Sequence, residues 1–296
     1  MKRGYVCFAL ALCGATPGLA LSAQSVTLPT WVCAHPDAIY ASAFQSGEIA
    51  VPHAPSNGSG GAYPGNVTRV VNVSGFGNQT YYLYLPPAYT PTRAWPAILV
   101  LHGAGGPGTS DSAAQQVRSD WSSTAATQQF IVISVVGTNA SGGWSPGSDV
   151  PIMSAQLDDA QAKYNIDADR IYLWGFSAGA HLAHALGLNN TDYFAAYGVS
   201  AGGLTQYACS DDGSFSPSCA ALLGGVARKI PVDIHLGDSD PLYTTYGAGN
   251  DPARFESYGW VLNQDLYYTL FSGGHTYTIP QLGDIWHNLC PNAVVP

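Results

Sequence analysis

Hydrophobic residues along this chain are concentrated in short continuous runs, and longer stretches that favour helix separate them. Runs of this kind are expected for strands that are buried on both faces of a sheet. The predicted strands are 97–101, 130–136, 171–174, 195–200, 232–236 and 267–271. The predicted helices are 112–128, 154–164, 178–186, 220–228, 252–263 and 281–289. Strands that alternate with helices predict an α/β fold whose mainly parallel sheet is covered on both faces.

The amino-terminal part of the chain has a different pattern. Residues 69–73 and 81–85 are rich in β-forming residues and flank a Gly- and Asn-containing turn, which predicts an antiparallel hairpin ahead of the parallel strands. Residues 24–66 contain many Ser, Pro, Gly and Ala and no long periodic run, so we expect a wrapping segment rather than a domain. We expect one catalytic domain over 67–296, with a long loop over 137–151.

The first 23 residues have the composition of a secretory signal. Lys2 and Arg3 supply the basic start, residues 5–12 form an apolar core, and cleavage is expected after Ala20 or Ala23. The apolar run is too short to cross a bilayer, and no later run is long enough. We therefore expect a secreted protein, extracellular or periplasmic, without membrane insertion.

The charge balance of the chain argues against two classes of partner. The formal net charge is −9, with 10 basic and 19 acidic residues. Removal of Lys2 and Arg3 with the signal leaves 8 basic against 19 acidic residues, a net charge of −11. A protein so poor in basic residues is not expected to bind nucleic acid or an anionic membrane.

Four cysteines remain after removal of the signal, and an even number in an oxidising compartment favours two disulfides with three possible connectivities. The preferred pairs are Cys209–Cys219, which closes a polar loop, and Cys33–Cys290, which joins the two ends of the chain. Four unpaired buried thiols are the alternative. The cysteine and histidine spacing predicts no metal site.

The most informative motif is Gly175-Phe176-Ser177-Ala178-Gly179, which lies between a predicted strand and a predicted helix. In this context G-x-S-x-G forms a nucleophile elbow, in which a strained turn exposes the serine hydroxyl. The amide groups at the start of the following helix face an oxyanion formed there. We therefore interpret Ser177 as a candidate nucleophile.

Two further predicted strands end in residues that could activate this serine. A serine hydroxyl needs an imidazole as base, and the imidazole needs a carboxylate to orient it. Asp240 and Asp238 both follow strand 232–236, and we prefer Asp240 because an aspartate in the position of Asp238 more often shapes a turn. His275 lies on a glycine-flanked loop after strand 267–271, whereas His287 falls in a predicted helix. The preferred triad is Ser177, Asp240 and His275.

The loop after strand 97–101 supplies a candidate oxyanion hole. It reads His102-Gly103-Ala104-Gly105-Gly106, and the backbone amides of Ala104 and Ala178 are the expected donors. Two aromatic residues are candidate substrate contacts. Trp144 could stack on a sugar or an aromatic acyl group, with loop packing as the alternative. Phe176 could form a wall of the acyl pocket, with support of the elbow as the alternative.

Together these motifs resemble the α/β-hydrolase fold, and within it the secreted polyhydroxybutyrate depolymerase and feruloyl esterase-like family. The resemblance covers roughly residues 67–290. It rests on Leu101-His102-Gly103, Trp144, the segments 164–172, 175–179 and 193–197, and Gly273-Gly274-His275-Thr276. The resemblance implies ester hydrolysis through Ser177, Asp240 and His275, without a metal or an organic cofactor.

We therefore expect a monomeric secreted serine esterase that acts through an acyl-enzyme. Its expected substrates are feruloyl or acetyl esters of polysaccharides, or polyesters such as polyhydroxybutyrate. A serine peptidase of the same fold and a catalytically inactive surface-binding protein are the alternatives. A surface-binding protein that had lost its activity would be expected to lack a member of the triad, and all three candidate residues are present.

Overall fold

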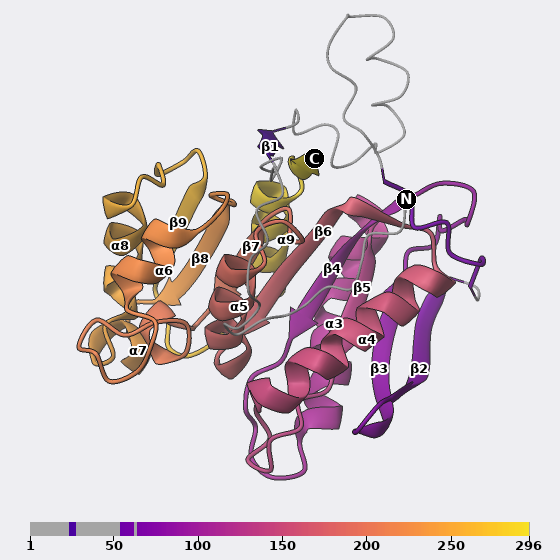
Figure 1. Ribbon diagram of the computed structural model, residues 1–296, viewed down its shortest axis with the longest axis horizontal. Coiled ribbons are helices and arrows are strands. Elements are labelled where there is room, and N and C mark those ends of the chain that lie inside the picture. Colours follow the sequence, from indigo (N-terminus) through magenta and orange to yellow (C-terminus); the bar gives the residue numbers. More distant parts are fainter. Residues whose placement is uncertain (1–23, 28–53, 62–63, 296) are drawn as a thin grey trace, which may run out of the picture.

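Eight of the strands in the described part of the chain form the main sheet, in the order β2-β3-β5-β4-β6-β7-β8-β9 (Figure 1). The computed structural model describes residues 24–27, 54–61 and 64–295. The predicted signal peptide, residues 1–23, and most of the predicted wrapping segment lie outside these ranges. The domain boundaries proposed from the sequence therefore remain predictions.

The sheet begins with antiparallel strands, as the sequence predicts. Strand β2 (Gly65–Val73) and strand β3 (Gly77–Leu85) form a hairpin, and β3 pairs antiparallel with β5 (Ile131–Val135). The remaining neighbours are parallel. They are β4 (Trp95–Leu101), β6 (Ile166–Phe176), β7 (Tyr197–Ser200), β8 (Val232–Gly237) and β9 (Leu266–Phe271). The predicted α/β fold class is confirmed.

Helices cover both faces of the sheet, and the side chains of the central strands alternate between two buried cores. In β4, Leu99 and Leu101 face one core, whereas Ile98 and Val100 face the other. The first core also includes apolar residues of α4 (Pro146–Lys163), α5 (Ala178–Asn189), α6 (Cys219–Gly225) and α8 (Asp251–Ser257). The second includes those of α3 (Ser110–Gln128) and α9 (Ile279–Leu289). Burial on both faces explains why these strands are continuously apolar.

Helix α4 begins earlier than predicted, so the expected loop 137–151 ends at residue 145. The helix starts at Pro146 and continues through Pro151. A proline is well tolerated in the first turn because its missing N–H has no intrahelical partner there. The carboxylate of Asp149 accepts a hydrogen bond from the Ser145 amide and so stabilises this start. The prediction was wrong because it treated Pro151 as the boundary of a loop.

Three shorter elements follow the strands that carry the candidate site. They are η1 (Leu204–Gln206), α7 (Pro241–Thr244) and η2 (Ala248–Asn250). Helix α8 ends at Ser257 rather than at the predicted residue 263. Gly259 follows with a φ of 86°, a left-handed conformation that ends helices and that glycine adopts without strain.

The two ends of the described chain meet in a small separate sheet. Strand β1 (Gln24–Thr27) pairs antiparallel with β10 (Asn292–Val295), and Figure 1 shows the carboxyl end of the chain next to β1. Neither strand was predicted. In the described part of the chain, no helix is both long and apolar enough to span a bilayer.

The structure contains the disulfide between Cys209 and Cys219. This disulfide closes the loop that precedes α6, where the sequence predicted it. Cys33 lies outside the described residues, so the expected pairing of Cys33 with Cys290 stays a prediction.

Candidate active site

Ser177 lies directly after β6 and directly before α5, in a strained backbone conformation. Its φ is 53° and its ψ is −118°, which a residue with a side chain rarely adopts. A conformation of this kind costs about 1–3 kcal/mol and persists only where the surroundings impose it. The strain at Ser177 is the geometry that the G-x-S-x-G motif predicts for an exposed nucleophile.

The two glycines of the motif are required by close backbone contacts. A Cβ on Gly175 would lie 2.2 Å from the carbonyl oxygen of Gly179. A Cβ on Gly179 would lie 2.3 Å from the carbonyl oxygen of Leu101. Both distances are far below van der Waals contact, so only glycine lets α5 approach β4 and β6 so closely. The elbow is thus fixed from both sides of Ser177.

The imidazole of His275 lies between the hydroxyl of Ser177 and the carboxylate of Asp240. Its Nε2 is 2.8 Å from Ser177 Oγ, and its Nδ1 is 2.9 Å from Asp240 Oδ2. With the proton on Nδ1, the ring donates to Asp240 and accepts from the serine hydroxyl. This is the arrangement in which a serine can pass its proton to a histidine.

Asp240 and His275 differ in their exposure to solvent. The side chain of Asp240 has no solvent exposure, whereas that of His275 is 39% exposed. The second carboxylate oxygen of Asp240 accepts a hydrogen bond from the Leu242 amide at 2.8 Å and caps α7. Asp240 is therefore held in one orientation, and the imidazole edge remains open to a substrate or to water.

Asp238 and His287, the rejected candidates, are placed elsewhere. The carboxylate of Asp238 accepts hydrogen bonds from the Gly273 amide and from the Ser239 hydroxyl, so it shapes the turn. His287 is exposed on α9. The structure thus brings together Ser177, Asp240 and His275.

The two residues that carry the proposed oxyanion donors, Ala104 and Ala178, both lie close to Gly143. A Cβ built on Gly143 would lie 3.2 Å from the Ala104 methyl group and 3.9 Å from the Ala178 methyl group. A Cβ built on Gly103 would lie 3.2 Å from Ser177 Cβ, so the glycine loop touches the elbow. Within residues 54–61 and 64–295, the amides of Ala104 and Ala178 have no hydrogen-bond acceptor. Both are available to an oxyanion.

His102 fixes this glycine loop in the neutral form. The Gly137 amide donates to His102 Nε2 at 3.0 Å, so the proton resides on Nδ1, which donates to the Gly103 carbonyl at 2.8 Å. Burial lowers the pKa of His102, which favours this neutral state. The ring therefore acts as a fixed connector between the loop after β4 and the loop after β5.

Trp144 strengthens the same connection. Its Nε1 donates to the His102 carbonyl at 2.8 Å, and its ring centroid is 4.5 Å from that of His102. The side chain is only 5% exposed. These contacts correspond to the loop-packing alternative, and a direct contact of Trp144 with substrate stays a prediction.

Asp149 joins the two ends of the loop 137–145. Its carboxylate accepts hydrogen bonds from the amides of Thr138 and Ser145, and burial raises its pKa. Because these bonds close the loop 137–145 over the glycine loop, Asp149 indirectly fixes the position of Gly143.

Phe176 packs behind the nucleophile. Its ring centroid lies 5.3 Å from that of His275 and 4.9 Å from that of Tyr277. A Cβ on Gly103 would lie 2.9 Å from the Phe176 ring. These contacts correspond to the alternative in which Phe176 supports the elbow, and a role in the acyl pocket stays a prediction.

The elbow helix also carries two histidines with different surroundings. His181 Nδ1 lies 2.9 Å from both the amide nitrogen and the carbonyl oxygen of Gly203. His184 is fully buried, with its Nδ1 3.0 Å from the Tyr197 hydroxyl, and burial lowers its pKa to about 3. Burial also lowers the pKa of His181, and both rings support the elbow helix rather than the hydroxyl of Ser177.

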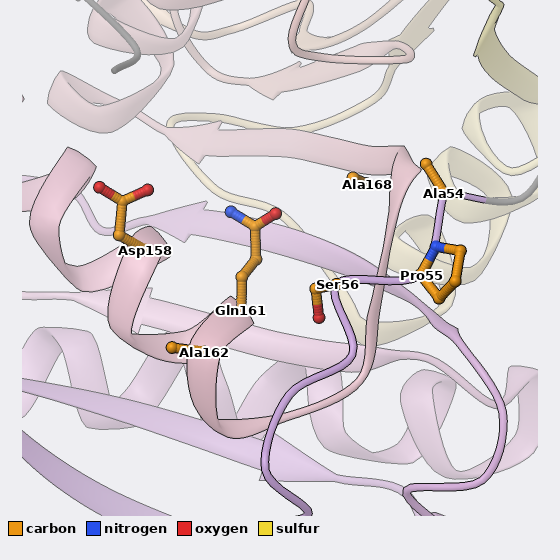
Figure 2. Close-up of a pocket in the computed structure, with 7 residues that line it drawn as sticks. All are labelled: Ala54, Pro55, Ser56, Asp158, Gln161, Ala162 and Ala168. Atoms are coloured by element: carbon orange, nitrogen blue, oxygen red, sulfur yellow. The ribbon is translucent and has the colours of Figure 1, made fainter. Parts of the chain in front are cut away.

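No cluster of three His, Cys, Asp or Glu side chains that could hold a metal occurs within the described ranges. A cavity of about 350 Å³ lies apart from the candidate site, and Figure 2 shows the side chains that line it. Its wall includes Asp158 and Gln161 of α4 and Ala168 near the start of β6, whereas Ser177 follows the end of that strand. The cavity is therefore not part of the constellation around Ser177.

The sequence did not reveal three contributors to this site. Asp149 could have been found, because Ser145-Pro146 followed by an acidic residue is a helix-start signal. Gly143 has no local signal that distinguishes it from other loop glycines. The hydrogen bond between Tyr277 and Asp120 joins residues that are far apart in the chain.

The central part of the chain matches a known protein family. Residues 82–205 match the BD-FAE family. This segment contains the glycine loop, the elbow and all of α5. It ends before Asp240 and His275, so the geometry of those two residues is independent of the match.

Three curated proteins are similar in sequence. The putative esterase NocK of Nocardia uniformis is 30% identical over 55% of this chain and 45% of its own. Poly(3-hydroxyalkanoate) depolymerase C of Paucimonas lemoignei is 27% identical over 51% of this chain and 39% of its own. Probable feruloyl esterase C of Aspergillus terreus is 26% identical over 58% of this chain and 63% of its own. The matched part spans less than two thirds of each relative.

Solved structures show the same fold. A ferulic acid esterase superimposes with a TM-score of 0.56 at 16% identity, over 77% of this chain and 94% of its own. A feruloyl esterase module from Clostridium thermocellum complexed with sinapinate gives a TM-score of 0.57 at 13% identity, over 82% of this chain and 93% of its own. At such low identity these likenesses concern the fold alone.

Proposed function

We propose that this chain, which has the α/β-hydrolase fold and whose residues 82–205 match the BD-FAE family, is a serine carboxylic-ester hydrolase. The observation that carries the proposal is the contact of His275 with both Ser177 Oγ and Asp240 Oδ2, at 2.8 and 2.9 Å. The strained backbone of Ser177 supports it, because such strain concentrates at functional sites.

In the proposed reaction, Ser177 Oγ attacks the carbonyl carbon of an ester while His275 Nε2 takes the hydroxyl proton. The negative charge that develops on the carbonyl oxygen is stabilised by the amides of Ala104 and Ala178. His275 then donates its proton to the leaving alcohol, and an acyl-enzyme on Ser177 remains. Asp240 keeps the proton on Nδ1 and stabilises the charged imidazole in between.

Release of the acyl group repeats these steps with water. The imidazole of His275 is exposed enough for a water molecule to reach Nε2. His275 takes a proton from this water, the hydroxide attacks the acyl carbon, and the proton returns to Ser177 Oγ as the carboxylic acid leaves. No redox step and no further reactant are required.

The proposed substrates are feruloyl or acetyl esters on polysaccharides, or polyesters such as polyhydroxybutyrate. The names of the curated relatives support this range, because they include a feruloyl esterase, an acetylxylan esterase and a poly(3-hydroxyalkanoate) depolymerase. We propose that the protein acts outside the cytosol as a monomer. The Cys209–Cys219 disulfide supports an oxidising compartment.

A fluorophosphonate probe tests the nucleophile directly, because it reacts covalently with an activated serine. We expect the intact protein to be labelled and Ser177→Ala to remain unlabelled, and equal labelling of both would refute the assignment. A hydrolysis panel then tests the substrate class. It contains p-nitrophenyl esters, methyl ferulate, acetylated xylan, polyhydroxybutyrate and a chromogenic peptide, and turnover of the peptide alone would support a peptidase instead.

A further inference from the structure

His275 reaches the nucleophile from a distant strand. Ser177 follows β6 and His275 follows β9, and β7 and β8 lie between these strands in the sheet. At the usual spacing of about 4.8 Å between strands, β9 lies roughly 14 Å from β6. The segment 272–278 must cross this distance to bring His275 Nε2 to 2.8 Å from Ser177 Oγ.

Backbone contacts fix both ends of this segment: the Gly273 amide donates to Asp238 and the Gly273 carbonyl accepts from the Ser239 amide, while Thr278 caps α9. The middle of the segment has fewer contacts. Gly273 and Gly274 precede His275, and a Cβ on Gly274 would contact nothing within 4 Å. Ser272, Thr276 and Thr278 are exposed, as is His275 itself. Tyr277 is half-buried, and its side chain packs against the core between the sheet and helices α3 and α9.

The side chain of Tyr277 is held at both its ring and its hydroxyl. The ring lies edge-on to Trp174 and Phe176, with centroid distances of 5.1 and 4.9 Å. Both residues belong to β6, and Phe176 immediately precedes Ser177. The hydroxyl donates to the carboxylate of Asp120 on α3. Tyr277 thus joins the segment that carries His275 to the strand that carries Ser177.

Asp120 is itself oriented for this contact. One carboxylate oxygen accepts a hydrogen bond from the Tyr277 hydroxyl. The other accepts one from the side-chain amide of Gln116, one helical turn earlier, at 2.7 Å. Burial and the bond to Asp120 raise the pKa of the Tyr277 hydroxyl, which therefore stays protonated and able to donate.

We propose that Tyr277, anchored by Asp120, is a positioning residue that holds His275 against Ser177. The inference rests on the proposed serine-esterase function. Tyr277 touches neither a substrate nor the reacting atoms in this scheme. Its effect is on the fraction of time for which Nε2 and Oγ are aligned, so its loss lowers kcat and the reactivity of Ser177 and leaves KM nearly unchanged.

The test compares substitutions on both sides of the anchor. Tyr277→Phe keeps the ring contacts and removes the hydrogen bond, Asp120→Ala removes the acceptor, and Asp120→Asn keeps an oxygen that can accept. Small displacements of catalytic groups cost up to about a hundredfold in rate, so we expect Tyr277→Phe and Asp120→Ala each to lower kcat by about tenfold. The double variant should be no slower than either single one, and Asp120→Asn should retain most of the activity.

A matched control uses the other end of the same helix. The Tyr82 hydroxyl donates to Asp111 at the start of α3, so Tyr82→Phe removes the same kind of bond without touching the His275 segment. We expect Tyr82→Phe to have the kcat of the wild type. The rate constant for labelling by a fluorophosphonate, measured per folded protein, provides a readout that does not depend on the choice of ester.

The outcomes separate the inference from the function it rests on. Unchanged kcat and labelling rate in Tyr277→Phe, in a wild type that hydrolyses esters through Ser177, would overturn the positioning role alone. Equal losses in Tyr82→Phe and Tyr277→Phe would also overturn it, because the effect would then be a general loosening of α3. A wild type that neither hydrolyses esters nor reacts with the probe would overturn both proposals.

Discussion

The replacement Asp240→Asn tests the proton relay with the smallest possible change of shape. In the structure Asp240 Oδ1 accepts from the Leu242 amide and Oδ2 accepts from His275 Nδ1. An asparagine keeps its oxygen toward Leu242, because only an oxygen can accept that bond. Its NH₂ group then faces Nδ1, and the imidazole can accept this donor only if its proton moves to Nε2.

That change of tautomer removes the base. With the proton on Nε2, His275 donates to Ser177 Oγ and cannot take the hydroxyl proton. The corresponding substitution in serine hydrolases with this relay lowers kcat by about four orders of magnitude, equivalent to about 5.5 kcal/mol in the barrier. If the asparagine flipped to spare His275, it would instead lose the cap on α7, at about 1 kcal/mol of stability.

The assay is the hydrolysis of p-nitrophenyl acetate, with kcat and KM measured at neutral pH for the wild type, Asp240→Asn and Asp238→Asn. Asp238 is the matched control, because an asparagine there can still accept from the Gly273 amide and has no contact with His275. We expect a loss of about 10⁴ in kcat for Asp240→Asn and a change within about twofold for Asp238→Asn. A folded Asp240→Asn protein that retained more than a tenth of the wild-type kcat would refute the relay.

Three further predictions concern the support of the site. Gly179→Ala forces a Cβ against the Leu101 carbonyl, so denaturant unfolding should show a loss of about 1–3 kcal/mol, and wild-type stability would contradict the contact. Trp144→Phe removes the bond to the His102 carbonyl, and esterase kcat should fall while KM changes little. Burial depresses the pKa of His184 to about 3, so the side chain is neutral in the folded protein. The stability that this neutral side chain contributes is fully present above pH 6.5. Below pH 6.5 the free energy of unfolding falls by about 1.4 kcal/mol for each pH unit. The fall in unfolding free energy between pH 6.5 and pH 4 should be smaller in His184→Gln, and an identical slope would contradict a neutral buried His184.

The sequence predicted the strands of this fold better than its loops, for a physical reason. β4 and β6 are buried on both faces, so every residue from Ile98 to Leu101 must be apolar and the run is unmistakable. The candidate triad could be proposed because parallel strands place their carboxyl ends at one edge of the sheet. By contrast, α4 was predicted too short, since Pro151 is tolerated inside a helix whose start is fixed by Asp149 and Ser145.

Contacts between distant segments could not be predicted from one sequence. Nothing local to Tyr277 indicates that its hydroxyl meets a carboxylate on α3, and nothing local to Gly143 indicates that it faces Ala104. These contacts depend on how the loops fold over the sheet edge. The aromatic character of Trp144 left open whether the indole faced a substrate or the His102 ring.

Asp240 and His275 lie outside the segment that matches the family, whereas Ser177 lies inside it, and backbone contacts explain how the two are aligned with the serine. The match ends at residue 205, whereas the acid and the base follow β8 and β9. A Cβ on Gly237, the last residue of β8, would lie 2.4 Å from the carbonyl oxygens of both Gly273 and Gly274. The acid turn and the His275 segment are therefore in direct backbone contact, and Asp238 ties them further through the Gly273 amide. The pair Asp240–His275 thus forms one unit, whose alignment with Ser177 depends on how that unit is anchored to β6.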